Sequence, residues 1–194
     1  MKDEPAVKEC IRLAAAALLV SASLSGCGDT ERYRAEEQFD VARKGLLPSV
    51  QELIIVPAKT DLSDQPYIKG KIAVFTKTRF KNGGENLGGY QSDIFYFRGL
   101  TEVYAARPGE VGTVALVDCH MVDKGVYKTD DGKEFPAEVK NCGLTMIDRS
   151  KGAVIFRKMF EVDPGAETKV YGNNVVQKSA ALDVLPFLQG LPRT

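Results

Sequence analysis

The chain has 194 residues, of which 44% are hydrophobic and 27% are charged, and its formal net charge at pH 7 is zero. These values are ordinary for a globular protein, and a chain of this length is expected to fold as one domain with a sizeable core. A neutral chain without a run of like charges lacks the basic field that attracts nucleic acid. We therefore expect no nucleic-acid binding.

The N-terminal segment carries an uninterrupted apolar stretch. Residues 13–24 read LAAAALLVSASL and follow the basic residue Arg12. This stretch is too short for a transmembrane helix, because a helix needs about 20 apolar residues to cross a bilayer. It fits the hydrophobic region of a secretory signal peptide. We therefore assign residues 1–26 to a signal peptide.

A cysteine stands directly after this segment, in the tetrapeptide Leu24-Ser25-Gly26-Cys27. The tetrapeptide resembles the lipobox of bacterial lipoproteins, which consists of Leu, two small residues and Cys. The resemblance covers only the first 27 or so residues. It implies that the Cys27 thiol receives a diacylglyceryl group, that cleavage makes Cys27 the new N-terminus, and that the attached lipid anchors the protein in the membrane.

The lipobox also implies a location. A protein with two or more acyl chains is stably anchored, whereas a single chain gives only marginal membrane binding. The resemblance places the protein in the bacterial cell envelope, facing the periplasm, and Gly28 after the cysteine favours the outer membrane over the inner one. An ordinary cleaved signal peptide that happens to be followed by a cysteine is the alternative.

Residues 27–50 are highly charged and sparse in apolar side chains. A helix over residues 31–44 is expected, ended by Gly45 and Pro48. This segment is either a tether that holds the domain away from the membrane or a helix laid loosely on the domain.

Two apolar segments come next, and both are expected to be strands. Residues 52–57 (ELIIVP) form a short run rich in Ile and Val. In residues 69–80 the side chains are expected to point alternately to the two faces of a strand. One face carries more charged residues, but Ala73 and Phe75 also lie on it, which indicates that the middle of that face is covered by other parts of the domain. The glycine-rich residues 82–90 lack the Lys-Ser/Thr of a phosphate-binding loop and are expected to form a flexible loop.

The middle of the chain is expected to hold a short strand at 94–97 (IFYF) and then one or two helical turns, which begin at Thr101 and end at Pro108-Gly109. Residues 111–121 contain the unbroken apolar run VALV. Such a run is typical of a strand that is buried on both faces at the centre of a sheet.

Of the four cysteines, Cys10 leaves with the signal peptide and Cys27 takes the lipid, so Cys119 and Cys142 remain. An even pair in an oxidising compartment predicts a disulfide, with two free buried thiols or metal ligands as the alternatives. The only histidine, His120, adjoins Cys119, but neighbouring residues of a strand point to opposite faces. We therefore expect no metal, no cofactor and no Ser-His-Asp site.

Two hairpins are expected around these cysteines. In residues 123–138 a calcium loop is a poor match, because Tyr127 and Thr129 stand where carboxylates are required, and Asp131-Gly132 instead predicts a type I′ turn. Residues 142–162 are expected to form the second hairpin. Its strands are residues 144–148 and 154–162, and its turn is 149–152.

Residues 178–192 predict a C-terminal helix that Ser179 caps and that Pro186 kinks. Three leucines have helical spacing and are expected to share its buried face: Leu182, Leu185 and Leu188.

The sequence therefore predicts an α+β or α/β fold. It comprises a signal peptide (1–26), a lipidated tether or loose helix (27–50) and one globular domain (51–194). The domain is expected to have a mixed, mainly antiparallel sheet of five or six strands and a C-terminal helix.

The missing catalytic pattern favours a lipid-anchored envelope protein that acts through contacts with a protein partner, rather than an enzyme. A small-ligand-binding module is one alternative. The other is an extracytoplasmic enzyme that uses paired carboxylates, for example Asp93 with Glu102 or Asp130 with Glu134.

Overall fold

The computed structural model of the chain describes residues 27–79, 89–128, 131–162, 170–171, 174–175 and 178–194. By internal contacts the chain divides into two units, Met1–Asp40 and Val41–Thr194. All the described strands belong to the second unit.

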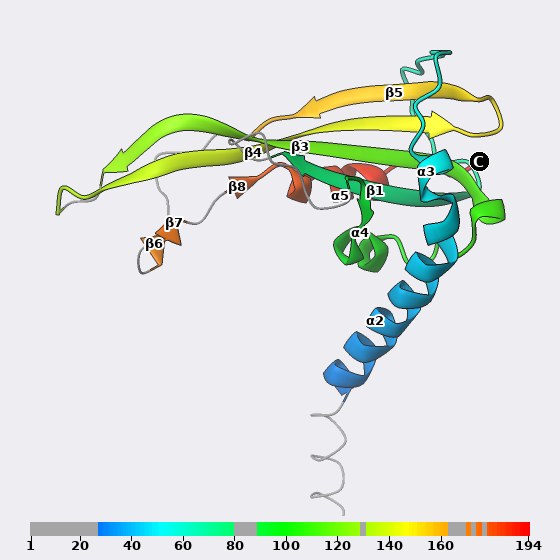
Figure 1. Ribbon diagram of the computed structural model, residues 1–194, viewed down its shortest axis with the longest axis horizontal. Coiled ribbons are helices and arrows are strands. Elements are labelled where there is room, and N and C mark those ends of the chain that lie inside the picture. Colours follow the sequence, from blue (N-terminus) through cyan, green and yellow to red (C-terminus); the bar gives the residue numbers. More distant parts are fainter. Residues whose placement is uncertain (1–26, 80–88, 129–130, 163–169, 172–173, 176–177) are drawn as a thin grey trace, which may run out of the picture. The chain divides into compact units, whose positions relative to one another are not determined.

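A six-stranded mixed sheet forms the framework of the second unit (Figure 1). Its strands are β1 (Lys71–Arg79), β2 (Gln91–Ser92), β3 (Val111–Lys128), β4 (Glu134–Asp148), β5 (Ala153–Phe160) and β8 (Lys178–Ser179). The order is β2-β1-β3-β4-β5, and β8 pairs with β4. The β1–β3 and β4–β8 pairs are parallel and the other three pairs are antiparallel. The predicted α+β class with a mixed, mainly antiparallel sheet is confirmed.

Short helices and turns complete the described elements. The helices are α2 (Cys27–Leu46), α3 (Val50–Leu53), α4 (Ile94–Gly99) and α5 (Ala181–Gln189), with 3-10 turns at Leu47–Ser49 and Pro108–Glu110. A separate two-stranded sheet pairs β6 (Val170–Tyr171) with β7 (Asn174–Val175). The predicted N-terminal helix is confirmed, and it is longer than residues 31–44.

The core lies where the middle of β1 pairs with the start of β3. Ile72 to Phe75 on β1 and Val114 to Val117 on β3 are at most 2% exposed, so both faces of the sheet are covered there. The predictions of a two-sided buried β3 and of a covered middle in β1 are confirmed. Such continuous apolar runs are expected where parallel strands lie inside a sheet.

The C-terminal helix packs on the sheet through aromatic side chains. The Phe187 ring on α5 stacks on Phe156 of β5 with 5.1 Å between centroids and meets Phe160 edge-on at 5.5 Å. The predicted Ser179 cap is wrong, because Ala180 is the N-cap residue and has no side-chain cap. Ser179 Oγ instead accepts a hydrogen bond from the Ala181 amide at 3.3 Å, one residue before the cap position.

The predicted leucine stripe of α5 is partly wrong. Val184 and Leu188 are the buried residues of the helix, whereas the Leu182 side chain is 63% exposed. Val184 and Leu188 are four residues apart and therefore share one face, while Leu182 points away from it. Pro186 lies inside the helix, as predicted.

Two predicted strands are helical instead. Within residues 52–57, helix α3 continues the chain from the 3-10 turn and ends at Leu53, and Ile55 and Val56 beyond it are exposed. An unbroken apolar run does not distinguish strand from helix, and local capping decides between them. At 94–97, Asp93 accepts a hydrogen bond from the Phe95 amide at 2.9 Å and thereby starts α4.

The predicted helical turns after Thr101 are also wrong. The Thr101 hydroxyl donates to the carbonyls of Phe97 and Arg98, so it closes α4 rather than starting a helix. Val103 and Ala105 then hydrogen-bond to the backbone of Ile72 along the edge of β1.

Both predicted hairpins are confirmed, as β3–β4 and β4–β5. Strand β4 begins at Glu134, ten residues before the expected start at 144, so it serves both hairpins. The predicted type I′ turn at Asp131-Gly132 is wrong, because that turn requires a positive φ at both residues and among them only Gly132 has one, at +78°. The last paired residues are Lys128 and Glu134, so the connection is longer than two residues. Residues 129–130 of that turn and residues 82–88 of the glycine-rich loop lie outside the described residues.

Candidate functional site

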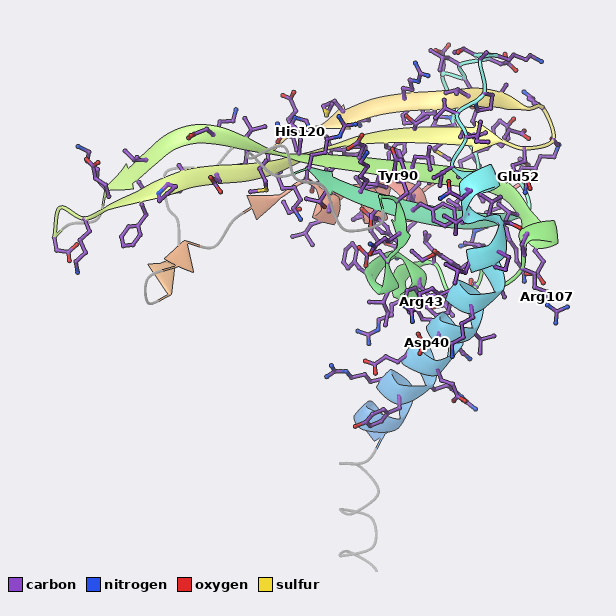
Figure 2. All side chains as sticks on the ribbon, in the orientation of Figure 1. Asp40, Arg43, Glu52, Tyr90, Arg107 and His120 are labelled. Carbon is purple, nitrogen blue, oxygen red and sulfur yellow. A yellow bond between two sulfur atoms is a disulfide. The ribbon has the colours of Figure 1, made fainter. Side chains whose placement is uncertain are left out.

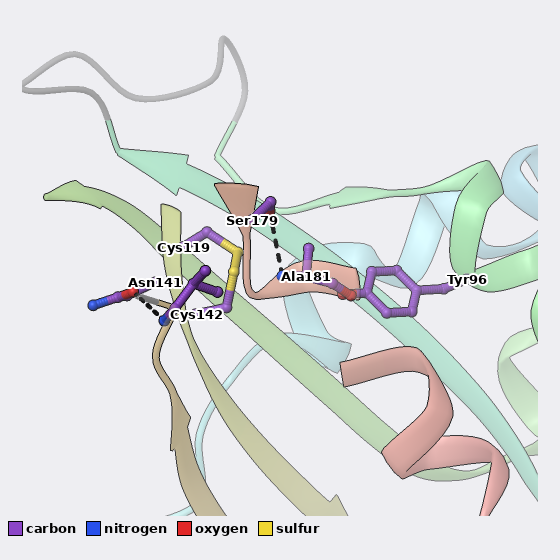
Figure 3. The surroundings of a disulfide bond; sticks show 7 residues. Tyr96, Cys119, Asn141, Cys142, Ser179 and Ala181 are labelled. Atoms are coloured by element: carbon purple, nitrogen blue, oxygen red, sulfur yellow. Dashed lines mark hydrogen bonds between the residues drawn. A yellow bond between two sulfur atoms is a disulfide. The ribbon is translucent and has the colours of Figure 1, made fainter. Parts of the chain in front are cut away.

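The two cysteines left in the predicted domain meet across β3 and β4. Cys119 and Cys142 are register partners, with 4.0 Å between Cα atoms and 2.09 Å between sulfur atoms. Both are at most 3% exposed. Figure 3 shows the bond in place between the strands. The predicted disulfide pair is confirmed.

The surroundings of the disulfide tie the sheet to the C-terminal helix (Figure 3). Next to Cys142, the Asn141 side-chain oxygen accepts a hydrogen bond from the Val162 amide at 3.1 Å. Tyr96 of α4 donates its hydroxyl to the Ala181 carbonyl at 3.4 Å, at the start of α5. The disulfide therefore lies where two strands and two helices converge.

Beyond the disulfide, β3 and β4 continue together as a two-stranded ribbon. We call this ribbon, residues 120–128 and 131–141, the arm. In Figure 1 it extends past the ends of β1 and β5. At its base β8 pairs with Val139 and Lys140. Further out, among the strands that the structure describes, β3 and β4 pair only with each other.

The tip of the arm carries apolar side chains that are exposed or half-buried. Tyr127 stands opposite Phe135, and Val126 opposite Pro136. Tyr127 and Phe135 are half-buried, while Val126 is 55% exposed. Lys128 and Glu134 close the ribbon with an exposed ion pair of 2.8 Å.

A bulge in β3 lies between the base and the tip of the arm. The register between the strands shifts between Asp123 and Val126. Gly125 has a φ of +98°, and its amide donates to the Asp123 carboxylate at 2.9 Å. A bulge bends a strand and increases its twist, so it sets the direction in which the tip points.

At the opposite end of the sheet, a buried carboxylate closes the β4–β5 turn. Asp148 is fully buried and accepts hydrogen bonds from the Ser150 amide and hydroxyl, the Lys151 amide and the Tyr67 hydroxyl, at 2.7 to 3.2 Å. Burial alone raises the pKa of Asp148, but these hydrogen bonds outweigh it and hold the pKa below its ordinary value. The carboxylate is therefore ionised near neutral pH.

Ser150 also accepts a hydrogen bond from the Lys69 ammonium at 2.7 Å. A serine between a lysine and an aspartate invites comparison with a nucleophile. However, the Asp148 carboxylate accepts its hydrogen bonds from amides of the turn and so closes it. Lys69, Asp148 and Ser150 also do not line the surface hollow at the ends of α4 and α5 or the one beside Arg43 and Tyr90. We therefore interpret Lys69, Asp148 and Ser150 as residues that stabilise the turn.

Two buried tyrosines are also structural. The Tyr104 hydroxyl donates to the Val74 carbonyl at 3.0 Å, and burial raises its pKa to about 12. Burial also raises the pKa of Tyr96. Both phenols are therefore neutral hydrogen-bond donors at physiological pH.

Surface hollows are lined by described residues of the second unit. One, of about 400 Å³, lies at the ends of α4 and α5 and is lined by Arg98, Gly99, Leu100, Thr101, Glu102, Gln189 and Arg193. Another, of about 350 Å³, is lined by Arg43, Leu47, Val50, Gln51, Tyr90, Gln91 and Ser92; Figure 2 labels Arg43 and Tyr90. Neither hollow contains a cysteine or histidine.

The described acidic residues of the enzyme alternative have structural partners. Asp93 caps α4, and Glu102 forms an exposed ion pair of 3.4 Å with Arg193. Asp130 lies outside the described residues. Among the described residues, no group of three or more His, Cys, Asp and Glu side chains could hold a metal ion. His120 (Figure 2) stands opposite Asn141 on the β3–β4 pair.

The predicted lipidation residue, Cys27, is the first residue of α2. The rest of the tetrapeptide, Leu24 to Gly26, lies outside the described residues. Within the part of the chain that the structure describes, no helix is long and apolar enough to span a membrane.

Comparisons of the chain with protein-family models, with characterised proteins and with solved structures find no match.

Proposed function

We propose that this chain is a lipoprotein of the bacterial envelope, anchored through lipid on Cys27, and that its domain binds another protein through the arm. The observation that carries the binding proposal is the arm, with its disulfide at the base and apolar residues at its tip. The anchor rests on the sequence Leu24-Ser25-Gly26-Cys27.

The construction of the arm supports a role in contact. An isolated two-stranded hairpin is marginally stable in water. This chain extends such a hairpin beyond its sheet and crosslinks it at Cys119–Cys142, beside the buried junction with α5. A stabilised ribbon presents Val126, Tyr127 and Phe135 in a fixed arrangement, which lowers the entropic cost of binding a partner.

The helix that begins at Cys27 supports the anchored arrangement. A helix of 20 residues, such as α2, is about 30 Å long. Its sequence is rich in charged residues, as expected of a spacer in water rather than a membrane segment. Of the two interpretations of residues 27–50, a helical spacer from the lipid is the one we propose.

The lipid anchor is tested by expressing the Cys27→Ala variant in a bacterial host that processes lipoproteins, with the Cys10→Ala variant as the matched control. Metabolic labelling with a fatty acid and membrane fractionation are the measurements. Cys27→Ala is expected to abolish labelling and to release the protein from membranes. Cys10→Ala leaves both unchanged, because Cys10 lies in the proposed signal peptide.

Persistent membrane attachment and labelling of Cys27→Ala would contradict the lipoprotein proposal. Equal loss in both variants would also contradict it, because the effect would then not depend on the lipobox cysteine.

A further inference from the structure

The outer edge of β5 is half covered by the chain itself. β5 is the last strand of the sheet order. On its outer side the Val154 amide donates to the Lys59 carbonyl at 3.0 Å, and the Asp61 amide donates back to the Val154 carbonyl at 2.8 Å. The Ser63 amide donates to the Ile155 carbonyl at 2.8 Å. These bonds show that this edge accepts an added extended segment.

The covering segment leaves the edge after Ser63. The Ser63 hydroxyl donates to the Gln65 carbonyl at 2.8 Å and accepts from the Gln65 amide at 3.2 Å, which turns the chain. Among the described residues, Arg157 to Phe160 have no backbone partner on the side away from β4. The uncovered stretch contains no proline, and the β4–β5 register shift lies before it, at Met146–Ile147.

The side chains along this uncovered edge are cationic and apolar. Arg157 and Lys158 are consecutive and exposed, and neither forms an ion pair with another described residue. Met159 is 51% exposed. The Lys158 ammonium lies 4.8 Å from the Phe160 ring centroid and 5.2 Å from that of Phe187. Because side chains alternate along a strand, Arg157 and Met159 lie on one face of β5, and Lys158 and Phe160 lie on the other. An added strand would therefore find a positive charge next to an apolar side chain on each face.

Charges on edge strands commonly protect proteins against edge-to-edge association. That protection depends on the sign of the charges that the incoming strand carries. Antiparallel pairing of β5 with a second copy would bring the Arg157-Lys158 pairs of both copies together, and like charges on facing strands destabilise pairing. An acidic strand meets no such barrier and gains cross-strand ion pairs instead.

We propose that the β5 edge from Arg157 to Phe160 binds an extended acidic segment of a partner protein as an added strand. The edge supplies backbone hydrogen bonds, and alternate side chains supply selectivity. This surface is separate from the arm, and its proposal shares with the proposed function only the premise that the domain binds proteins.

The experiment measures amide hydrogen exchange of the full chain with two added probe peptides in excess. One probe alternates glutamate with valine, and the other alternates lysine with valine. Because β5 is paired with β4 through this stretch, alternate amides already face β4, and only those that face away from it report on an added strand. The glutamate peptide is expected to slow exchange of these outward amides, and the lysine peptide leaves their exchange unchanged. The double change Arg157→Glu, Lys158→Glu is expected to weaken binding of the glutamate peptide at least about tenfold, because two attractions become repulsions.

The matched control is the double change Arg34→Glu, Lys44→Glu, which places the same charge change on exposed residues of helix α2. It is expected to leave binding of the glutamate peptide unchanged. All the replaced side chains are exposed, so thermal unfolding of the variants is expected to stay close to that of the original chain.

Three results would overturn the proposal. The first is equal or absent protection, by both peptides, of the Arg157 to Phe160 amides that face away from β4. The second is protection of these amides without any peptide, whether constant or rising with protein concentration, because the chain itself or a second copy would then occupy the edge. The third is a loss of binding in the Arg34→Glu, Lys44→Glu control that equals the loss in the Arg157→Glu, Lys158→Glu variant. None of these results bears on lipidation of Cys27 or on contacts of the arm.

Discussion

The two hairpins of this sheet share strand β4 but are stabilised in different ways. The β4–β5 turn is held by a buried carboxylate, Asp148, which accepts four hydrogen bonds from the turn and from Tyr67. The tip of the arm formed by β3 and β4 has cross-strand side-chain pairs and exposed ion pairs, Lys128–Glu134 and Lys133–Asp131. It is crosslinked at its base by Cys119–Cys142.

Strand β4 therefore takes part both in the framework of the sheet and in the arm, which we propose as a contact surface. Buried hydrogen bonds stabilise the end of the sheet where segments from across the chain meet. A covalent bond stabilises the end that extends into solvent, where few buried contacts are available. We therefore expect variants at the two ends to differ in which part of the protein they loosen.

Removal of the disulfide is expected to have the largest effect. Because Cys119 and Cys142 are 23 residues apart, Cys119→Ala should lower the free energy of unfolding by about 3 kcal/mol. Cys142→Ala should have a similar effect, and the double variant should be no worse than either single one. Chemical denaturation measures the loss, and hydrogen exchange should increase mainly in the arm. Alkylation of both cysteines without prior reduction would contradict the bond.

Replacement of the buried carboxylate should come next. Asp148→Ala is expected to lower the free energy of unfolding by about 2 kcal/mol, because the Tyr67 hydroxyl and the turn amides lose a charged acceptor. The control is Asp131→Ala near the exposed tip of the arm, with an expected change below about 0.5 kcal/mol. Hydrogen exchange in Asp148→Ala should increase at the β4–β5 turn and not in the arm. Equal losses from both variants would contradict the comparison.

A pH titration should distinguish the β4–β5 turn, which a carboxylate stabilises, from the arm, which a disulfide crosslinks. The pKa of Asp148 is lower in the folded protein than the unfolded value of about 3.9. Its contribution is therefore fully present above about pH 4 and is lost as the pH falls through the folded pKa. Denaturation at pH 6 and pH 3 should show a smaller acid-induced loss in Asp148→Asn than in the original chain. An equal loss in both proteins would mean that Asp148 does not contribute.

The smallest effect on stability is expected at the tip of the arm. Tyr127→Ala removes one cross-strand pair with Phe135 and should lower the free energy of unfolding by less than about 1 kcal/mol. Thermal unfolding measures the change. A loss as large as that of Cys119→Ala would show that the tip is part of the folding core, which conflicts with a contact role.

The sequence predicted the fold class, both hairpins and the disulfide because these follow from patterns that hold locally. The alternation over β1, the unbroken run in β3 and the turn before Ala153 each identify a strand without reference to the rest of the chain. An even pair of cysteines in a presumed exported chain likewise needs no structure to suggest a bridge.

The errors occurred where local backbone structure outweighed the side-chain pattern. At 94–97 the aromatic run suggested a strand, but the Asp93 cap starts a helix, and this cap was a signal available in the sequence. Residues 52–57 have no such signal, since helix α3 there continues the path of the preceding turn.

The features on which the proposals rest were only partly predictable from sequence. The sequence predicted a hairpin over 123–138 and a strand over 144–148, but not that one continuous strand, β4, runs from Glu134 to Asp148 through both. The half-covered edge of β5 depends on a contact between residues 59–63 and 154–155, which are distant in sequence. Non-local pairing of this kind is decided by tertiary packing.

The most direct test of the proposed function is site-specific photocrosslinking in living cells from the tip of the arm. A photoreactive residue at Val126 is compared with one at Leu182 on α5, since both positions are exposed. The account predicts one dominant crosslinked protein from Val126 and none of that species from Leu182. No product from Val126, or the same products from both positions, would contradict the claim that the arm binds a partner.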